Sequence, residues 1–543
     1  MFISGLNAQN MKFRTDDYAK EWKEISVLEA QGLPKSALQK VEELLAKSKK
    51  EGNPSQLIKS LIYQAKYTSE LEEEGFVKAV NIMHTDMDKA AFPTKQILQS
   101  MLAEMYSRYL DNNIWRLRDR TNTTNFKTDD IRTWTIQQLS DESALLYRLS
   151  LNDDRSKEVA IKVFDAITTE GSDERRPVLF DFLAHRAIDY FMDEKTYLSK
   201  PSYTFELNNE ALFGIPEKFV GIKLESPDST SMKLWTLKLM QEVLRFHLKD
   251  ENPTALIDAD LKRLSFVHQN AVMSNKDDLY IKTLEGLRSK YADNPAYVEI
   301  SLKIAQHYHN KAANWKPNPE NIGKFDNKKA LEIAKEAIKK YPTAYGAGSC
   351  RALIDEITNP SVDFKIEEVN VPNKAILSSV NFKNLDSIYY KIIRLYENTN
   401  RRDFKDEQER LKYYNSLPVV KKGTAILPND GDYNNHTTEI KIDKLQTGTY
   451  LMLAADNDKY ALKNSAKVTY TIFNVSNIAY WQRTSADEPN EFVVVDRSSG
   501  VPLAGVTVEF WESRYNSKTR SDEKIKIGTT VSDRNGFVYS RLP

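Results

Sequence analysis

The stretch TEIKIDKLQTGTYLMLAA, residues 438–455, decides how the C-terminal half of this 543-residue chain folds. Polar and apolar residues alternate at its start, Thr447 and Gly448 mark a turn, and an apolar run follows through Tyr450 and Leu453. Alternation with a period of two is typical of a β-strand that buries one face. The stretch therefore predicts an outer strand, a turn, and an apolar strand that returns.

The same alternation extends in both directions from this stretch. It appears in SIYYKIIRLYE (387–397) and in AKVTYTIFNVSNIAYW (466–481), and it begins after Asn359 and Pro360. We expect residues 359–482 to form one β-sandwich, because about 120 residues suffice for roughly seven strands.

A second β unit is predicted for residues 486–543, and it starts with FVVVDRSSGVPLAGVTVEFW (492–511). Asp496 to Gly500 form one turn, and Asn535 with Gly536 form another, since both residue types tolerate positive φ. Only about three or four strands can be counted, against roughly seven in a sandwich. We interpret the unit as the truncated first half of a sandwich. We expect it to pair with the first sandwich, to be completed by a neighbouring chain, or to be poorly ordered after about Trp511.

Residues 13–358 carry apolar residues at helical spacing instead. In KSALQKVEELLAKSKK (35–50) one stripe holds Leu38, Val41, Leu44 and Leu45. Gly52 is expected to end this helix, and Asn53 and Pro54 to begin the next one. The pattern returns at Asn294 and Pro295 and in KKALEIAKEAIKKYPTAYGA (328–347), so helix hairpins are predicted at both ends of the region. These hairpins loosely resemble tetratricopeptide (TPR) repeats, and the middle of the region keeps no clean period.

Composition narrows the classes of function. The chain has 77 basic and 77 acidic residues, which argues against nucleic acid or an anionic membrane as a partner. Cys350 is the only cysteine, which rules out an intramolecular disulfide. No apolar run reaches the about eighteen residues of a membrane-spanning helix. Residues 1–12, which begin MFISGLNAQN, look like the end of a longer secretory leader or, alternatively, a frayed tail.

The two β segments resemble the alpha-2-macroglobulin family, specifically its large bacterial (Bacteroidetes-type) members with a helical region ahead of the macroglobulin domains. Residues 438–455 with FNVSNIAYWQR (473–483) are similar to the end of a first macroglobulin sandwich. Residues 492–511 with SDRNGF (532–537) are similar to the opening of the next one, a second (MG2-type) macroglobulin domain. Segments 130–151 and 175–191 look like helices of the same bacterial proteins.

The resemblance implies a protease trap, that is, an endopeptidase inhibitor. Members of the family are much longer than this chain, and many capture their target through a Cys–Gln thioester after a bait region is cleaved. Cys350 lacks the sequence context of that thioester, and no bait region is recognisable. We therefore expect this chain to be the N-terminal, scaffold or docking part of such an inhibitor.

Few residues suggest catalytic or metal chemistry. Asp181, His185 and Asp189 follow each other at a spacing of four on one helix face, where they form either a metal site or, as we favour, an ion-paired surface. His307 and His309 point to different faces of a helix, and Asp533 to Gly536 are better explained as a turn than as a calcium loop. Cys350 follows GAGS at a turn between helices and is interpreted as a packing residue. We assign no catalytic, cofactor-binding or metal-binding residue, and no cofactor.

Two functions remain open. The first is the inhibitor part described above, not an enzyme, exported to the periplasm or cell surface, with proteases as partners of the full-length protein. The alternative is a helical-repeat and β-sandwich module that binds cell-envelope proteins and inhibits nothing. In either case a lipid-anchor cysteine is conceivable upstream of residue 1.

Overall fold

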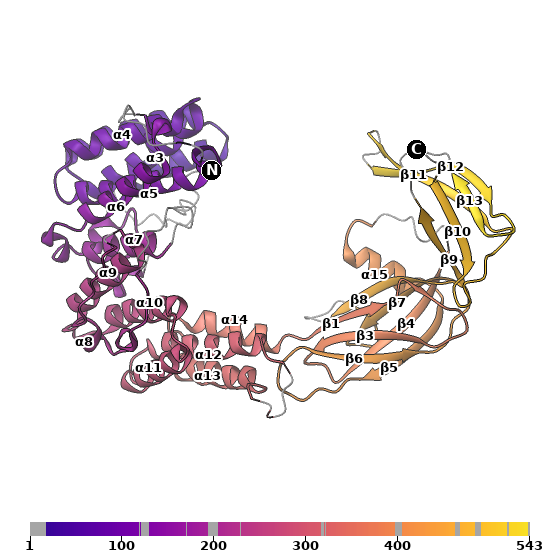
Figure 1. Cartoon of the computed structure of the whole chain (residues 1–543). Coiled ribbons are helices and arrows are strands. Elements are labelled where there is room, and N and C mark those ends of the chain that lie inside the picture. The colour runs from indigo at the N-terminus through magenta and orange to yellow at the C-terminus, as the bar shows by residue number, and fades with distance from the viewer. Residues whose placement is uncertain are drawn as a thin grey trace. The chain divides into compact units, whose positions relative to one another are not determined.

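The computed structural model describes residues 18–118, 120, 130–169, 171–193, 205–228, 230–316, 320, 322–396, 404–461, 467–483, 490–517 and 521–540. Its elements follow the predicted order, with helices first and mainly antiparallel strands after them (Figure 1). The chain divides into two compact units, Met1–Ile300 and Ser301–Pro543. Among the described residues, no helix combines the length and the apolar character needed to cross a membrane.

The first unit is built from helices. They are α1 (Ala19–Ala30), α2 (Pro34–Glu51), α3 (Pro54–Leu71), α4 (Gly75–Lys89), α5 (Thr94–Leu117), α6 (Ile136–Leu149), α7 (Leu179–Met192), α8 (Pro216–Phe219), α9 (Met232–His247), α10 (Thr254–Asn270) and α11 (Lys276–Lys290). Short 3₁₀ helices lie at Ile131–Thr133, Asp154–Lys157, Ile161–Phe164, Ser172–Glu174 and Glu210–Phe213. Helix α12 (Tyr297–Ala313) crosses the division between the units.

The turn between α2 and α3 shows why these helices begin and end where they do. Gly52 takes the left-handed conformation at φ +64°, which is the usual C-terminal stop of a helix. The Asn53 side chain then accepts a hydrogen bond from the Gln56 amide at 3.1 Å, and Pro54 occupies the first turn of α3. The predicted stop, cap and first turn are all confirmed at these three residues.

The second unit contains the rest of α12 and then α13 (Asp326–Lys340) and α14 (Ala347–Thr358), which precede a β-sandwich. Its strands are β1 (Ser361–Ile366), β2 (Val369–Asn370), β3 (Ile376–Lys383), β4 (Ser387–Leu395), β5 (Val419–Ile426), β6 (His436–Ile442), β7 (Gly448–Ala455) and β8 (Val468–Val475). They form one sheet in the order β1-β3-β6 and another in the order β2-β8-β7-β4-β5. All pairs are antiparallel except β2 with β8.

The stretch 438–455 contributes one strand to each sheet of the sandwich. β6 pairs with β3, whereas β7 pairs with β4 and β8, so the turn after Ile442 carries the chain from one sheet to the other. The burial patterns of β6 and β7 explain this arrangement. β6 alternates and buries one face, whereas β7 is apolar on both faces and therefore fits the middle of a sheet that is covered on both sides.

Helix α15 (Glu407–Ser416) covers the outer face of the five-stranded sheet. Leu411 and Tyr414 of this helix pack with Ile393, Leu451 and Leu453 on the outer face of the five-stranded sheet. The inner face packs against the three-stranded sheet in a separate apolar core. The sequence analysis did not predict this helix.

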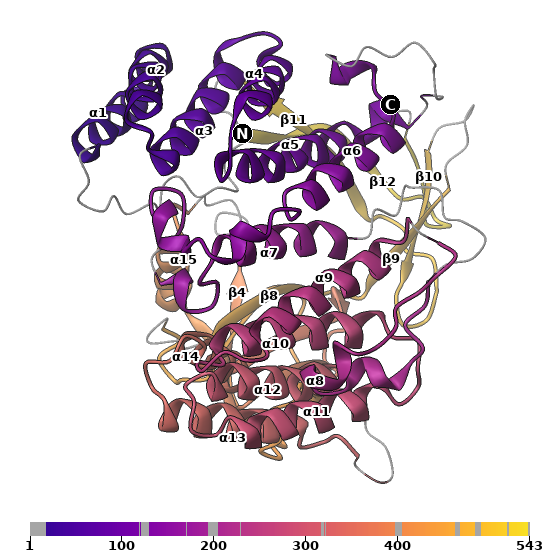
Figure 2. The ribbon, with the colours of Figure 1, turned by 90° about the vertical axis from the view of Figure 1, so that its left-hand side faces the viewer.

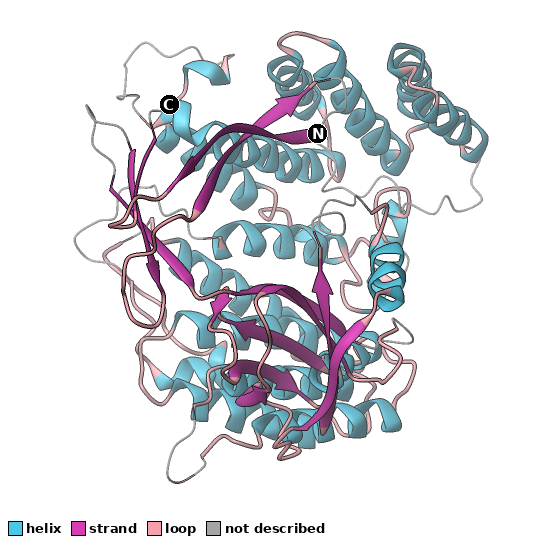
Figure 3. Ribbon diagram, turned by 90° about the vertical axis from the view of Figure 1, so that its right-hand side faces the viewer, coloured by secondary structure: helices cyan, strands magenta, loops and turns pink. Residues whose placement is uncertain are grey.

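The second β unit contains β9 (Ile478–Arg483), β10 (Asn490–Asp496), β11 (Thr507–Asn516), β12 (Ser521–Val531) and β13 (Phe537–Ser540) (Figure 3, magenta). β13, β10 and β9 form one sheet, and β11 with β12 forms a hairpin. β9 lies in the interval 359–482, yet it pairs with β10 along its whole length. Residues beyond Trp511 form the rest of β11 and all of β12 and β13.

Candidate functional site

Asp181, His185 and Asp189 all lie on α7, but the structure separates their roles. Asp181 and His185 are buried, whereas the Asp189 side chain is 63% exposed and pairs with Lys262 Nζ at 2.5 Å. The predicted ion-paired surface is therefore wrong for the first two residues. The cause is packing: α7 contacts α5, α6 and α9, so more than one of its faces is covered (Figure 2).

Asp181 joins a buried network with His247 at the end of α9. His247 Nε2 donates to Asp181 Oδ1 at 2.7 Å, and His247 Nδ1 donates to Asp250 Oδ2 at 2.6 Å. The other oxygen of Asp181 accepts from the Val178 amide at 3.2 Å. Burial disfavours the charged imidazole, but the two carboxylates outweigh it and raise the pKa of His247. The network ties α7 to α9.

His185 has the opposite character. Its Nε2 lies 4.0 Å from Asp258 Oδ2, and its Nδ1 has no hydrogen-bond partner among the described residues. Burial, together with the charges of Arg176 and Lys262, lowers the pKa of His185 well below its usual range, so the ring is neutral. Asp181, His185 and Asp189 thus contact different partners and do not converge on one ion.

Cys350 is a buried residue inside α14. Burial raises the pKa of its thiol to about 11, so the sulfur carries its proton at neutral pH. The thiolate is the nucleophilic form of cysteine. This environment suits the packing role that the sequence analysis gave to Cys350.

Asp533 to Gly536 form a turn between β12 and β13. Asp533 Oδ1 accepts from the amides of Asn535 at 2.8 Å and Phe537 at 2.9 Å, and Gly536 has φ +79°. The carboxylate oxygen that a calcium loop would offer to an ion is occupied by the backbone of the turn itself.

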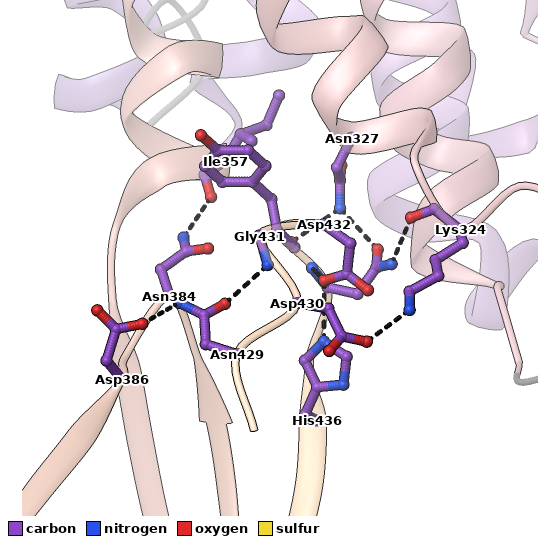
Figure 4. Close-up of polar contacts among 12 residues, drawn as sticks. Lys324, Asn327, Ile357, Asn384, Asp386, Asn429, Asp430, Gly431, Asp432 and His436 are labelled. Atoms are coloured by element: carbon purple, nitrogen blue, oxygen red, sulfur yellow. Dashed lines mark hydrogen bonds and ion pairs between the residues drawn. The ribbon is translucent and has the colours of Figure 1, made fainter. Parts of the chain in front are cut away.

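An extensive set of polar contacts in the second unit forms a junction between its helices and the first sandwich (Figure 4). We define the junction by Lys324, Asn327, Glu356 and Ile357 on the helical side and by Lys383, Asn384 and the loop 429–436 on the sandwich side. Asn327 and Asn434 are nearly inaccessible to solvent. Buried amides of this kind need hydrogen-bond partners, and here they satisfy one another.

Asn327 is the centre of the junction. Its Nδ2 donates to the Tyr433 carbonyl at 3.0 Å and to Asn434 Oδ1 at 3.1 Å, while its Oδ1 accepts from His309 Nδ1 at 2.7 Å. In return, Asn434 Nδ2 donates to the Lys324 carbonyl at 2.8 Å. Each side therefore supplies both donors and acceptors.

A second set of contacts lies at the end of α14. Asn384 Nδ2 donates to the Ile357 carbonyl at 2.8 Å, and Lys383 Nζ donates to the Glu356 carbonyl at 2.8 Å. The last carbonyls of a helix have no partner within the helix, so these bonds cap α14 with groups from the sandwich. An ion pair between Lys324 and Asp430 adds to the first set.

The loop that carries Asn434 is held from within as well. Asp432 Oδ1 accepts from His436 Nε2 at 2.8 Å and from the Asn434 amide at 2.9 Å. Tyr433 adopts φ +62°, a conformation that costs a residue with a side chain about 1–2 kcal/mol. The hydrogen bond from Asn327 to the Tyr433 carbonyl helps to offset that cost.

The sequence analysis did not predict the junction. It did not show that the polar residues of the loop 429–436 face a helix. The polar residues Asp432, Asn434 and His436 gave no such signal, because Asp and Asn are also the usual residues of a solvent-exposed turn.

Comparison with known proteins adds little to this geometry. No protein-family model matches the sequence, and no curated protein matches it. Among solved structures, the chain is similar to native alpha-2-macroglobulin from Escherichia coli spanning domains MG0-NIE-MG1, at 18% identity and a TM-score of 0.23. The match covers 34% of this chain and 58% of that chain, and likeness at such a score carries no argument for fold or function. The finer assignment to Bacteroidetes-type members stays a prediction.

Proposed function

We propose that this chain is the scaffold part of a bacterial alpha-2-macroglobulin-like endopeptidase inhibitor and is not itself an enzyme. The junction is the main support for the proposal, because its buried amides form hydrogen bonds that hold the helices against the sandwich. The residues that resemble macroglobulin domains in sequence, 438–455 and 492–511, lie in two successive β units. Only Ser476 and Asn477 separate β8, the last strand of the first sandwich, from β9 of the second β unit.

The geometry supports a scaffold for a physical reason. Domains joined by a flexible linker move independently, whereas hydrogen bonds between buried groups hold one relative orientation. A protein that encloses its target needs domains in a defined order and orientation. The junction supplies such a constraint between α13, α14 and the first sandwich.

In this proposal the full-length protein is exported to the periplasm or the cell surface, and its partners are proteases. The experiment uses the longer protein that contains this chain, with trypsin as the probe. Residual trypsin activity is measured on casein and on a small peptide nitroanilide. The proposal expects cleavage of casein to be lost and cleavage of the nitroanilide to be retained. Equal activity on both substrates contradicts it.

The alternative is a module that binds cell-envelope proteins, and one observation is relevant to it. An apolar pocket opens between two helix hairpins of the first unit. Its chemistry is compatible with an inhibitor as well as with a binding module, so the pocket does not decide between the two functions.

A further inference from the structure

The pocket lies where two helix hairpins of the first unit turn. The end of α2 and the start of α3 form one side, and the end of α4 and the start of α5 form the other. Its volume is about 490 Å³, within the range of roughly 300–1,000 Å³ that is usual for small-ligand sites. The pocket is thus large enough for one or two side chains of a partner.

Its lining is mainly apolar and partly open to solvent. Leu61 and Leu98 lie buried at its base, while Leu57, Phe92 and Pro93 are half-buried around them. Phe92 is held in place by Arg155, whose guanidinium lies 4.2 Å from the centre of the ring. Apolar side chains that remain partly exposed in a concave site gain free energy when a ligand covers them.

The charged residues at the rim give the pocket a net charge. Lys49 Nζ pairs with Asp86 at 3.0 Å, which joins α2 to α4 across the opening. Lys89 is exposed and makes no ion pair within the part of the chain that the structure describes. With two lysines and one aspartate in the lining, the pocket has a net positive charge and suits a ligand that carries a carboxylate.

We propose that this pocket binds a short acidic segment of a partner protein, with a leucine or phenylalanine side chain inserted among Leu57, Leu61 and Phe92. An adjacent carboxylate of the segment then pairs with Lys89. The apolar contact supplies most of the affinity, because an exposed ion pair contributes little. The charge selects acidic over basic segments. This inference goes beyond protease inhibition and does not depend on it.

The test measures fluorescence polarisation of labelled peptides with the full chain. The probe is Glu-Asp-Leu-Phe-Asp-Glu; one comparison peptide replaces its acidic residues by lysine, and another replaces Leu-Phe by Ala-Ala. The inference expects the acidic apolar probe to bind at least about tenfold more tightly than the Ala-Ala peptide. Against the lysine peptide it expects a smaller preference, about threefold, because only the exposed ion pair is lost. A second copy of the chain or a small apolar molecule as the true occupant would give no preference among the three.

Two variants test whether the probe peptide binds in this pocket. Ala91→Trp fills it from an exposed lining position and is expected to weaken probe binding at least about tenfold. Lys89→Glu is expected to weaken the acidic probe more than the lysine peptide. Lys35→Glu, at the opposite end of α2, is the charge-matched control and should change nothing.

The outcomes that overturn the inference are equally definite. They are absence of saturable binding at millimolar probe, unchanged binding in a folded Ala91→Trp variant, or equal effects of Lys89→Glu and Lys35→Glu. Circular dichroism confirms that each variant is folded before its binding is measured.

Discussion

His247 donates a hydrogen bond to Asp181 across 2.7 Å, from the end of one buried helix to the first turn of another. Because Asp250 accepts from the other ring nitrogen, the imidazole carries a proton on both nitrogens and is held as a cation between two carboxylates. A charged group this deep is maintained only by its partners. The pair is therefore a sensitive probe of the helical unit.

The first prediction concerns pH. The pKa of His247 is raised in the folded state, so its stabilisation is complete below about pH 6.5, the ordinary value, and is lost as pH rises through the raised pKa. The neighbouring His185 has a lowered pKa and acts in the opposite sense, destabilising the fold as pH falls below about 6.5. We expect the stability difference between the native chain and His247→Gln to shrink between pH 6.5 and 8.5. Hydrogen exchange of α7 and α9 amides measures it, and a difference independent of pH would contradict the assignment.

The second prediction concerns removal of the imidazole. His247→Ala leaves Asp181 Oδ1 buried without its charged partner and should destabilise the first unit by about 3–5 kcal/mol. The control is His84→Ala, because His84 pairs with Asp88 on the exposed surface of α4 and should cost less than about 1 kcal/mol. Urea unfolding measures both. Similar losses of stability in the two variants would show that the buried pair of His247 and Asp181 contributes no more than the exposed pair of His84 and Asp88.

The third prediction uses two glycines of the second β unit with similar backbone angles. Gly500 and Gly536 have φ +72° and +79°, but only at Gly536 would an added Cβ meet another atom, the Val494 carbonyl oxygen at 2.4 Å. Both alanine variants incur about 1–2 kcal/mol for the left-handed conformation. Gly536→Ala should lose roughly another 1–3 kcal/mol, because Val494 must move. Faster hydrogen exchange in β10 and β13 than in the Gly500→Ala variant is the expected result, and equal exchange would refute it.

These cases show what can be predicted from the sequence. The α2–α3 turn is predictable because Gly52, Asn53 and Pro54 act locally, each through its own backbone preference. Helix α15 also had a local signal: Asp406 accepts from the Glu409 amide, and Leu411 and Tyr414 follow at helical spacing.

The partners of buried polar residues could not be predicted in the same way. Asp181 and His247 are 66 positions apart, and Asn327 and Asn434 are 107 apart. No periodicity relates residues at such distances, because tertiary packing alone brings them together. The helical spacing of Asp181, His185 and Asp189 was correct, yet the surface interpretation failed for two of them because α7 is covered on more than one face.

The fourth prediction concerns the centre of the junction. Asn327→Ala removes the bonds to the Tyr433 carbonyl and to Asn434, and should destabilise the loop 429–436 by about 1–3 kcal/mol. Asn314→Ala is the matched control, since the Asn314 side-chain amide donates to the exposed Asn310 carbonyl and, within the part of the chain that the structure describes, to no other residue. Hydrogen exchange of the loop amides should accelerate in the first variant only. Protection retained in Asn327→Ala would mean that the loop is ordered without the helix.

The central claim, that the junction fixes the helices on the sandwich, is tested most directly by one distance measurement. Spin labels are placed at the exposed Lys339→Cys of α13 and Lys441→Cys of β6, in a Cys350→Ala background, and their separation is recorded by pulsed electron paramagnetic resonance. A fixed junction predicts a single narrow distribution of distances that broadens when Asn327→Ala and Asn434→Ala are introduced together. A broad distribution with the native junction would contradict the claim.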